Sequence, residues 1–167
     1  MERARSEGFV AYLKELAERR DRGALATLRR SLAFPPGSDP RSFRYVEPWV
    51  VDAEGWDRQT FYLVAGLFAI HPVGGDTSLP EALADVCRRD EKKGVEARFL
   101  ALLDSDLDQL PDRLRRIMAL LPDGMGINWA GLTSDLLRWF NPQRTVQRAW
   151  ARQFYRRTSQ ASDEQGA

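Results

Sequence analysis

The stretch NPQRTVQRAWARQFYRR (residues 141–157) carries two sets of side chains at helical spacing. Arginines recur every four residues, at Arg144, Arg148, Arg152 and Arg156. This spacing places them along one face of a helix, about one turn apart. Val146, Trp150 and Phe154 form a second stripe on roughly the opposite face. The pattern predicts a helix that docks by its apolar side and presents arginines outward, as the binding of a polyanion requires.

The flanks of this stretch set its expected limits. Asn141 is a favourable helix cap, and Pro142 would occupy the favoured first helical position. No acidic residue occurs from Leu136 to Ser162, so the outward side is uniformly basic. The tail from Thr158 is polar, and we expect it to be disordered.

The rest of the chain is also predicted to be helical. Apolar residues at helical spacing mark residues 9–16, 24–32, 56–70, 79–87, 95–103, 110–121 and 129–140. No convincing alternating strands, repeats or low-complexity tracts occur. The sequence therefore predicts an all-α fold of about eight helices in two small bundle-like lobes. With a boundary at Lys92-Lys93-Gly94, these are an N-terminal helical lobe (1–93), a C-terminal helical bundle (94–157) and a disordered tail (158–167).

Composition places the chain among ordinary soluble globular proteins. Its 167 residues suffice for one domain or two small lobes, with 43% hydrophobic and 29% charged residues. The net charge of +1 does not by itself indicate a nucleic-acid binder. However, 22 of the 25 basic residues are arginine. An arginine-rich genome would explain this bias, and so would a need for bidentate phosphate contacts, which lysine cannot make.

The apolar runs indicate the compartment, whereas the cysteine content bears only on disulfides. The single cysteine, Cys87, rules out an internal disulfide, and its place on an apolar stripe predicts a buried thiol. The N-terminus has no apolar signal core. The longest apolar stretch, residues 61–70, is far shorter than the roughly 20 residues of a membrane span. We therefore expect a cytoplasmic protein with no membrane partner.

The residue sets of common enzymes are missing. The sole histidine, His71, precedes Pro72 at a helix end with no partner pattern, so we expect a capping or surface residue. One histidine and one cysteine cannot supply a usual zinc set. No glycine-rich loop ends in Lys-Ser or Lys-Thr, which excludes a nucleotide phosphate loop. The sequence thus predicts no catalysis, no metal and no cofactor.

The acidic run Asp104, Asp106, Asp108 resembles the start of a calcium-binding loop. Position six of that loop would be Gln109 rather than glycine, and position twelve would be Arg115 rather than glutamate. The run is therefore interpreted as a solvated connection between two helices.

Basic residues also gather in three further places. Arg29 and Arg30 end the second helix, Arg98 lies in GVEARFLALL (94–103), and Arg113, Arg115 and Arg116 lie in LPDRLRRIMALL (110–121). A solvated helix face carries such residues in any case, so each cluster alone indicates little. Convergence of the clusters on one surface would indicate an interface, but sequence cannot show convergence.

The order of these landmarks resembles a known family. ALATLRRS (24–31) is followed by FRYVEPWV (43–50), TSLPEAL (77–83), ARFLALLDSDLDQLPDRLRRIMALL (97–121), INWAGLTSDLLRWFNPQ (127–143) and the basic last helix. This series resembles the CasB family, the small subunit of the type I-E CRISPR surveillance complex, Cascade. The resemblance runs from about residue 8 to residue 156. None of the motifs is a catalytic signature, so the resemblance rests on their order and spacing.

The resemblance implies a non-catalytic helical protein. It implies two copies joined head to tail, beside the other Cascade subunits that hold the guide RNA. It also implies a basic surface that holds target DNA, including the displaced strand, and stabilises the R-loop in antiviral defence. By position, that surface maps onto Arg29, Arg30, Arg58, Arg98, Arg115, Arg116, Arg138 and Arg144, and helix geometry adds Arg148. The end helix varies in this family, so Arg152 and Arg156 are not carried over.

Two other interpretations stay open at this point. The protein could be a helical adaptor whose arginines form ion pairs with protein partners. It could also be a free-standing DNA-binding regulator, which would need a recognition helix. WAGLTSDLLRWF (129–140) is a poor recognition helix because its polar side is short.

Overall fold

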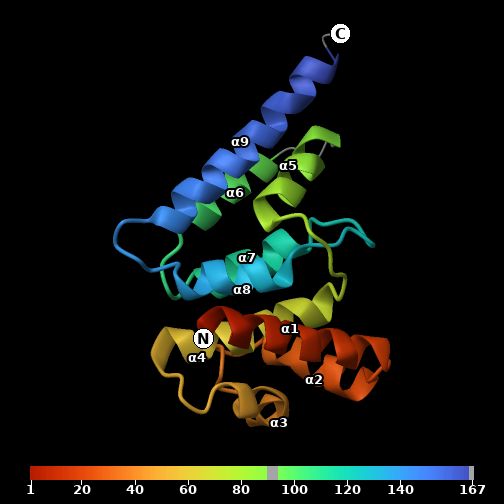
Figure 1. The fold of residues 1–167 in the computed structure, drawn as a ribbon, viewed down its shortest axis with the longest axis vertical. Helices are drawn as coiled ribbons and strands as arrows, with labels where there is room; N and C mark the ends of the chain where they lie inside the picture. The colour runs from red at the N-terminus through yellow and green to blue at the C-terminus, as the bar shows by residue number, and fades with distance from the viewer. Residues whose placement is uncertain (90–93, 166–167) are drawn as a thin grey trace. The chain divides into compact units, whose positions relative to one another are not determined.

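The computed structural model describes residues 1–89 and 94–165, and regular structure there is helical throughout (Figure 1). These residues form nine α-helices, α1 to α9, and two short 3-10 helices, η1 and η2. The prediction of an all-α fold is confirmed. The chain forms two compact units: unit 1 contains Met1–Gly74 and Trp129–Leu137, and unit 2 contains Gly75–Asn128 and Arg138–Ala167.

This division differs from the consecutive lobes 1–93 and 94–157 expected from the sequence. Helix α5 (Leu79–Arg89) belongs to unit 2, whereas α8 (Trp129–Leu137) belongs to unit 1. The expected boundary at Lys92 and Lys93 lies outside the described residues. Helical spacing shows which face of a segment is apolar, but not which distant helix covers it, so the exchange of α5 and α8 could not be predicted.

Helix α4 (Gly55–Ile70) is the centre of unit 1. Every residue from Phe61 to Ala69 is buried, so the helix is covered on all sides. Helix α2 (Arg22–Ser31) approaches it closely at Gly66. A Cβ atom there would lie 2.5 Å from Cδ2 of Leu32 and 3.2 Å from the carbonyl oxygen of Leu28. Any larger residue at position 66 would therefore have to displace Leu32 and press on the backbone of α2.

Helix α8 completes unit 1 by packing against α1 (Glu2–Glu18) and α4. Two indole N–H groups hold its ends: Trp129 donates to the carbonyl oxygen of Val73 at 3.0 Å, and Trp56 donates to that of Leu136 at 2.6 Å. The Trp129 ring also meets Phe68 edge-on at 5.4 Å. The apolar side of α8 is thus buried inside unit 1.

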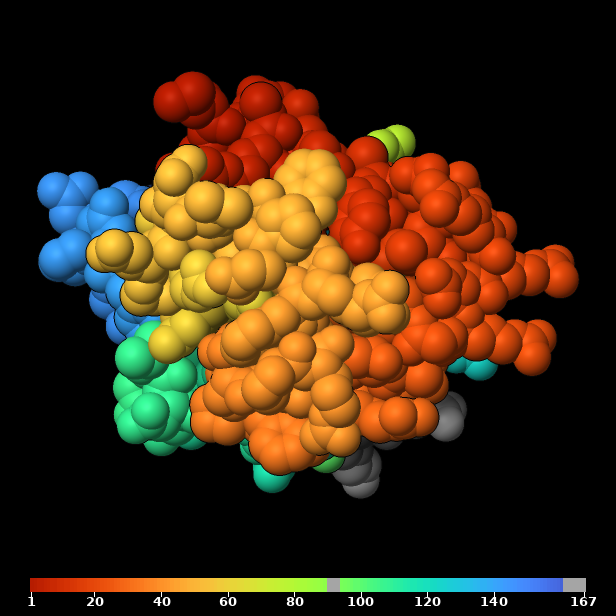
Figure 2. Space-filling view, turned by 90° about the horizontal axis from the view of Figure 1, so that it is seen from below, coloured from red at the N-terminus to blue at the C-terminus, as the bar shows by residue number. Residues whose placement is uncertain are grey.

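The segment between α2 and α4 forms η1 (Pro40–Ser42), α3 (Phe43–Val46) and η2 (Glu47–Trp49). Trp49 packs on Phe9 and Tyr12 of α1, with ring centroids 5.8 and 5.6 Å apart. Figure 2 looks onto the face of unit 1 where this segment lies beside α1 and α2. Trp49 therefore fastens this segment to the first helix.

Unit 2 is built around α9 (Thr145–Gln165), which packs against α5. Helix α6 (Val95–Leu103) lies beside α9, with Phe99 stacked on Phe154 at 4.4 Å, and α7 (Leu110–Met118) packs on α6. Trp150 meets Trp139 edge-on at 5.0 Å. Val146, Trp150 and Phe154 are 2%, 1% and 1% exposed, which confirms the predicted docking stripe.

The ends of α9 differ from those expected. Asn141 does not cap the helix: its Oδ1 accepts from the backbone N–H of Gln143 at 2.9 Å, forming a turn. Arg144 follows in the left-handed region (φ 53°), and the helix begins at Thr145. At the other end the helix continues through Gln165, past Thr158, where the polar tail was expected to begin; residues 166–167 lie outside the described residues.

Two single residues also differ from expectation. Cys87 is half-buried rather than buried, and this burial raises the pKa of its thiol. His71 does end α4, with its backbone N–H donating to Leu67 at 3.2 Å and to Phe68 at 3.1 Å. Its side chain is buried, however, at 6% exposure. The capping interpretation of His71 is therefore correct and the surface interpretation is wrong.

The first prediction concerns the docking stripe of α9. Replacing Trp150 by Ala removes a fully buried indole and should lower the free energy of unfolding by about 3–5 kcal/mol. Arg152→Ala, on the exposed side of the same helix, should change it by no more than about 0.5 kcal/mol. Urea unfolding followed by circular dichroism measures both. Equal effects of the two substitutions would contradict the assigned core face.

Candidate nucleic-acid interface

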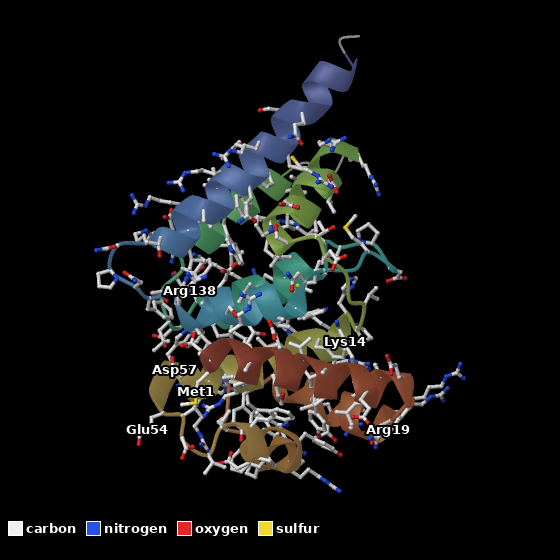
Figure 3. The ribbon with its side chains drawn as sticks, viewed as in Figure 1. Met1, Lys14, Arg19, Glu54, Asp57 and Arg138 are labelled. Carbon is white, nitrogen blue, oxygen red and sulfur yellow. The ribbon has the colours of Figure 1, made fainter. Side chains whose placement is uncertain are left out.

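The exposed side of α9 carries a regular line of arginines. Arg148, Arg152 and Arg156 are exposed, and each lies one helical turn from the next. Within the described part of the chain, none of their side chains pairs with a carboxylate. Figure 3 shows nitrogen-tipped side chains projecting from α9 on the side away from α5. We name these three residues the α9 arginine line.

The opposite side of α9 uses an arginine for packing. Arg157 donates from Nε and Nη2 to the two carboxylate oxygens of Asp85 on α5, at 3.0 and 3.1 Å. Its Nη1 lies 3.9 Å from Glu81, and the hydrogen bond to Asp85 raises the pKa of Arg157. Such a bidentate pair fixes orientation as well as distance. Sequence analysis missed this role, although Arg157 follows Trp150 and Phe154 at seven and three residues, on the docking side.

Arg144 is engaged at the end of α6. Its Nη2 donates to the carbonyl oxygen of Leu103 at 2.7 Å and lies 3.6 Å from Asp104. The guanidinium thereby satisfies a carbonyl group that the helix end leaves without an intrahelical donor. The side chain is still 52% exposed, so its remaining N–H groups face solvent. Arg144 thus differs from the α9 arginine line, because part of its hydrogen-bonding capacity holds the fold.

The basic cluster of α7 is partly neutralised. Asp112 accepts from Arg115 at 2.8 Å and from Arg116 at 2.9 Å, so one carboxylate serves two guanidinium groups. Arg113 donates to the carbonyl oxygen of Ala101 at 2.7 Å and to Ser105 at 3.3 Å. It fastens α7 to α6. Arg115 and Arg116 keep one net positive charge between them on the exposed side of α7.

Arg98 lies on α6 but not on the side that meets the arginine line. Glu96, two residues earlier, accepts a hydrogen bond from Tyr155 of α9 at 2.8 Å. Residues two apart in a helix do not share a face, so Arg98 lies on a different side of α6. It is exposed, and no ion pair of its side chain occurs among the described residues. The structure therefore does not bring Arg98 into line with Arg148.

Three predicted site residues belong to unit 1. Arg29 donates to the carbonyl oxygen of Ala69 at 3.3 Å, while Arg30 beside it is exposed. Arg58 bonds to the carboxylate of Glu47 and donates to the carbonyl oxygen of Val50 at 3.1 Å. Of these three, Arg58 is the most occupied by internal contacts. Arg138, where the chain re-enters unit 2, is exposed and makes interactions of its own (Figure 3).

Arg58 belongs to a cluster with Glu47 and Tyr62. The Tyr62 hydroxyl donates to one oxygen of Glu47 and Arg58 donates to the other. These bonds, Tyr62 first and Arg58 second, hold the pKa of Glu47 below its ordinary value. Burial and the bond to Glu47 raise the pKa of Tyr62. This arrangement joins η2 to α4, which is a structural role.

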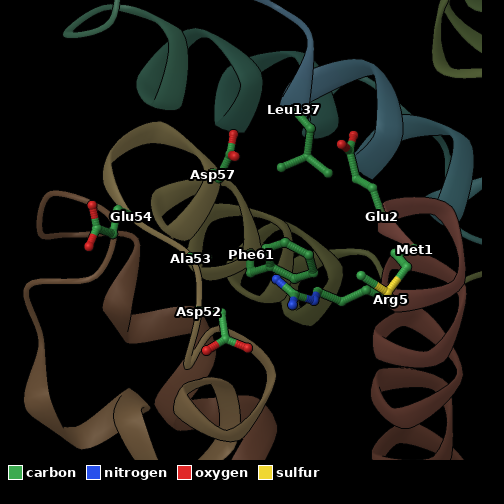
Figure 4. A pocket seen from close by; sticks show the side chains of 9 residues that line it. All are labelled: Met1, Glu2, Arg5, Asp52, Ala53, Glu54, Asp57, Phe61 and Leu137. Atoms are coloured by element: carbon green, nitrogen blue, oxygen red, sulfur yellow. The ribbon is translucent and has the colours of Figure 1, made fainter.

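Unit 1 also contains a pocket of about 200 Å³ (Figure 4). Its charged lining consists of the carboxylates Glu2, Asp52, Glu54 and Asp57 around the guanidinium of Arg5. An excess of carboxylates repels phosphate, so this pocket does not suit a nucleic-acid backbone. Acidic surface of this kind balances the arginines in the net charge of +1.

Neither a membrane span nor a metal-binding cluster is found in the described residues. No helix there is long and apolar enough to cross a membrane. Residues 1–89 and 94–160, whose side chains are described, contain no group of three or more His, Cys, Asp or Glu side chains placed to hold a metal ion. Asp106 of the acidic run instead caps the backbone N–H of Gln109 at 2.9 Å.

Comparison with known proteins gives consistent matches. The family model for the CRISPR-associated protein Cse2 matches residues 24–155. A CRISPR-associated protein Cse2 of Thermus thermophilus is 45% identical over 157 residues, which cover 89% of each chain. The crystal structure of M. ruber CasB is similar, with 35% identity, a TM-score of 0.78 and 98% of both chains covered. A chain of a CRISPR RNA-guided surveillance complex has 25% identity and a TM-score of 0.84, covering 98% of this chain and 99% of that one.

The second prediction separates Arg144 from Arg148. Arg144→Glu removes the donor to Leu103 and places a carboxylate near Asp104, so it should lower the free energy of unfolding by about 1–3 kcal/mol. Arg148→Glu should change it by no more than about 0.5 kcal/mol. Chemical denaturation of both variants tests this. The structural assignment of Arg144 is wrong if the two charge reversals are equally harmless.

The third prediction concerns pH. The depressed pKa of Glu47 contributes stability that is fully present above the ordinary glutamate value of about 4.3 and is lost as pH falls through the lower folded-state pKa. Glu47→Gln should therefore destabilise the protein at pH 7, and the difference from wild type should shrink toward pH 3. Tyr62→Phe, which removes one donor, should reproduce part of the effect. The urea unfolding midpoints of wild type and both variants, measured from pH 3 to pH 7, test this. A stability difference that does not change with pH would exclude an ionic contribution from Glu47.

Proposed function

Because the chain belongs to the CRISPR-associated Cse2 family, we propose that it is the non-catalytic small subunit of a type I-E RNA-guided surveillance complex, Cascade. It works in the cytoplasm in antiviral defence. Its partners are the other Cascade subunits that hold the guide RNA, the target DNA, and a second copy of itself joined head to tail. It needs no cofactor.

The observation that carries this proposal is the α9 arginine line. Three exposed guanidinium groups at regular spacing stand on a helix whose other side is fixed in the core of unit 2. Arginines already engaged by carboxylates would have to exchange partners to bind phosphate, whereas these three do not. Contacts to phosphate carry no sequence information, which suits a complex whose guide RNA reads the sequence.

The energetics of strand exchange explain why such a surface has an effect. The guide–target heteroduplex is about as stable as the DNA duplex that it replaces, so R-loop formation is nearly balanced. A few phosphate contacts to the separated strands, including the displaced one, shift this balance toward the open state. The subunit therefore stabilises the R-loop without catalysing any reaction.

The predicted site residues of unit 2 contribute unequally to this surface. Arg148 contributes directly, and Arg152 and Arg156 extend the surface beyond the positions that the family resemblance covers. Arg98 is exposed, with no ion pair of its side chain in the described residues, but it lies on another side of α6. Arg30 is a separate exposed cation of unit 1. Arg115, Arg116, Arg138 and Arg144 take part with reduced capacity. In unit 1, Arg29 is held by the carbonyl oxygen of Ala69, and Arg58 is mainly structural.

The adaptor interpretation is the second candidate. Its supporting observation is that the exposed guanidinium groups of the α9 arginine line could equally form ion pairs with carboxylates of a protein partner. It predicts that removing the α9 arginine line leaves nucleic-acid binding unchanged at any salt concentration.

The fourth prediction tests the function in the assembled complex. Arg148→Glu with Arg152→Glu should leave assembly intact but weaken binding of duplex target at low salt, since the separated strands meet two carboxylates instead of two cations. The loss should shrink as salt rises and should be smaller for a target with a pre-opened bubble. Loss of two phosphate contacts should also make the log–log salt slope shallower by about 1.4–1.8.

The matched control reverses Arg20 and Arg22, two exposed arginines of unit 1 outside the proposed surface that form no ion pair among the described residues, with the same change in net charge. It should bind target like wild type. Unchanged affinity of the Arg148/Arg152 variant, in a normally assembled complex at low salt, would reject the proposed role of the line.

A further inference from the structure

An exposed aromatic ring stands within the α9 arginine line. Tyr155 is 39% exposed, whereas the other aromatic residues of this helix, Trp150 and Phe154, are each 1% exposed. It follows Arg152 by three residues and Arg148 by seven, so the three share one face of the helix. Arg156 is its chain neighbour. A planar apolar surface is therefore placed among regularly spaced cations.

The ring is held in a defined orientation. Its hydroxyl donates to Oε1 of Glu96 on α6 at 2.8 Å, and its ring meets Phe154 edge-on at 5.1 Å. Phe154 is itself stacked on Phe99 of α6. Tyr155 is thus fixed at both ends of its side chain, which lowers the entropy cost of binding on its free surface.

The side chain of Tyr155 is also neutral, which suits contact with a polyanion. Burial, followed by the hydrogen bond to Glu96, raises the pKa of Tyr155 above its ordinary value. The phenol therefore stays neutral at physiological pH and does not repel phosphates. Leu100, one turn after Glu96 on α6, is 42% exposed and adds apolar surface on the same side of that helix.

We propose that Tyr155 stacks on an unpaired base of a single strand whose backbone follows Arg148, Arg152 and Arg156. This inference rests on the proposed function, because it requires α9 to hold nucleic acid, and it names the form of nucleic acid that is held. Proteins that bind single strands without sequence preference combine a basic track with aromatic rings on which bases stack. A duplex buries its base faces in its own stack, so the ring selects single strands over duplex.

The isolated full-length protein tests this with labelled oligonucleotides at low salt, followed by fluorescence anisotropy. One strand carries ordinary bases, and the other has the same length and phosphates but a central abasic stretch. Tyr155→Ala should weaken binding of the ordinary strand by roughly 5- to 150-fold, the range for one stacked base, and leave the abasic strand unaffected. Wild type should accordingly prefer the ordinary strand. DNA and RNA versions of both strands distinguish the two sources of an unpaired base.

Two control variants separate stacking from other effects. Tyr155→Phe keeps the ring and loses the bond to Glu96, so it should retain most of the preference for the ordinary strand. Arg148→Gln should weaken binding of both strands to the same extent and make the log–log salt slope shallower by about 0.7.

The outcomes are distinct. Suppose that Tyr155→Ala weakens binding of both strands equally, or of neither, while Arg148→Gln weakens binding of both. The proposed role of the arginine line is then supported and the stacking proposal is wrong. Equal binding of the two strands by wild type overturns stacking in the same way. If wild type binds neither strand, the proposed function fails together with this inference, and the exposed Tyr155 then belongs to a protein interface.

Discussion

The packing of α9 on α5 and α6 is the interaction on which the rest of unit 2 depends. Phe154 stacks on Phe99, Trp150 meets Trp139, and Arg157 holds Asp85 through two hydrogen bonds. These contacts occupy one side of α9 completely. The remaining side, which has nothing left to bury, carries exposed arginines. The exposed arginines thus lie on a helix whose position is fixed by the contacts of its opposite side.

Arginine performs two different tasks in this protein. Where a carboxylate or a helix-end carbonyl lies within reach, as for Arg58, Arg144 and Arg157, the guanidinium joins separate elements. Where no such bond forms among the described residues, as for Arg148 and Arg152, the charge stays available to solvent or to a ligand. The difference lies in the neighbours, because the side chains are chemically identical. The arginine-rich composition therefore overstates the charge that can meet a polyanion.

Unit 1 is organised by a different constraint, the burial of α4 on all sides. A helix that is apolar around its whole circumference needs several others to cover it. Gly66 lets α2 approach, and α8 returns from a distant part of the sequence to cover another side. Two tryptophan N–H groups then hold α8 at its ends. This explains why the chain leaves unit 2 for nine residues and then re-enters it.

The sequence alone determined the helical class, the two faces of the last helix and the resemblance to a family, because each depends on spacing along the chain. Val146, Trp150 and Phe154 were assigned to the core on spacing alone, and they are buried. Only the tertiary structure decided which arginines are free. Asp85 and Arg157 lie 72 residues apart, and Leu103 and Arg144 lie 41 apart. No local pattern records such pairs. The position of α8 in unit 1 could not be predicted for the same reason. Nor could the hydrogen bond from Tyr155 to Glu96, which holds an exposed ring among the arginines.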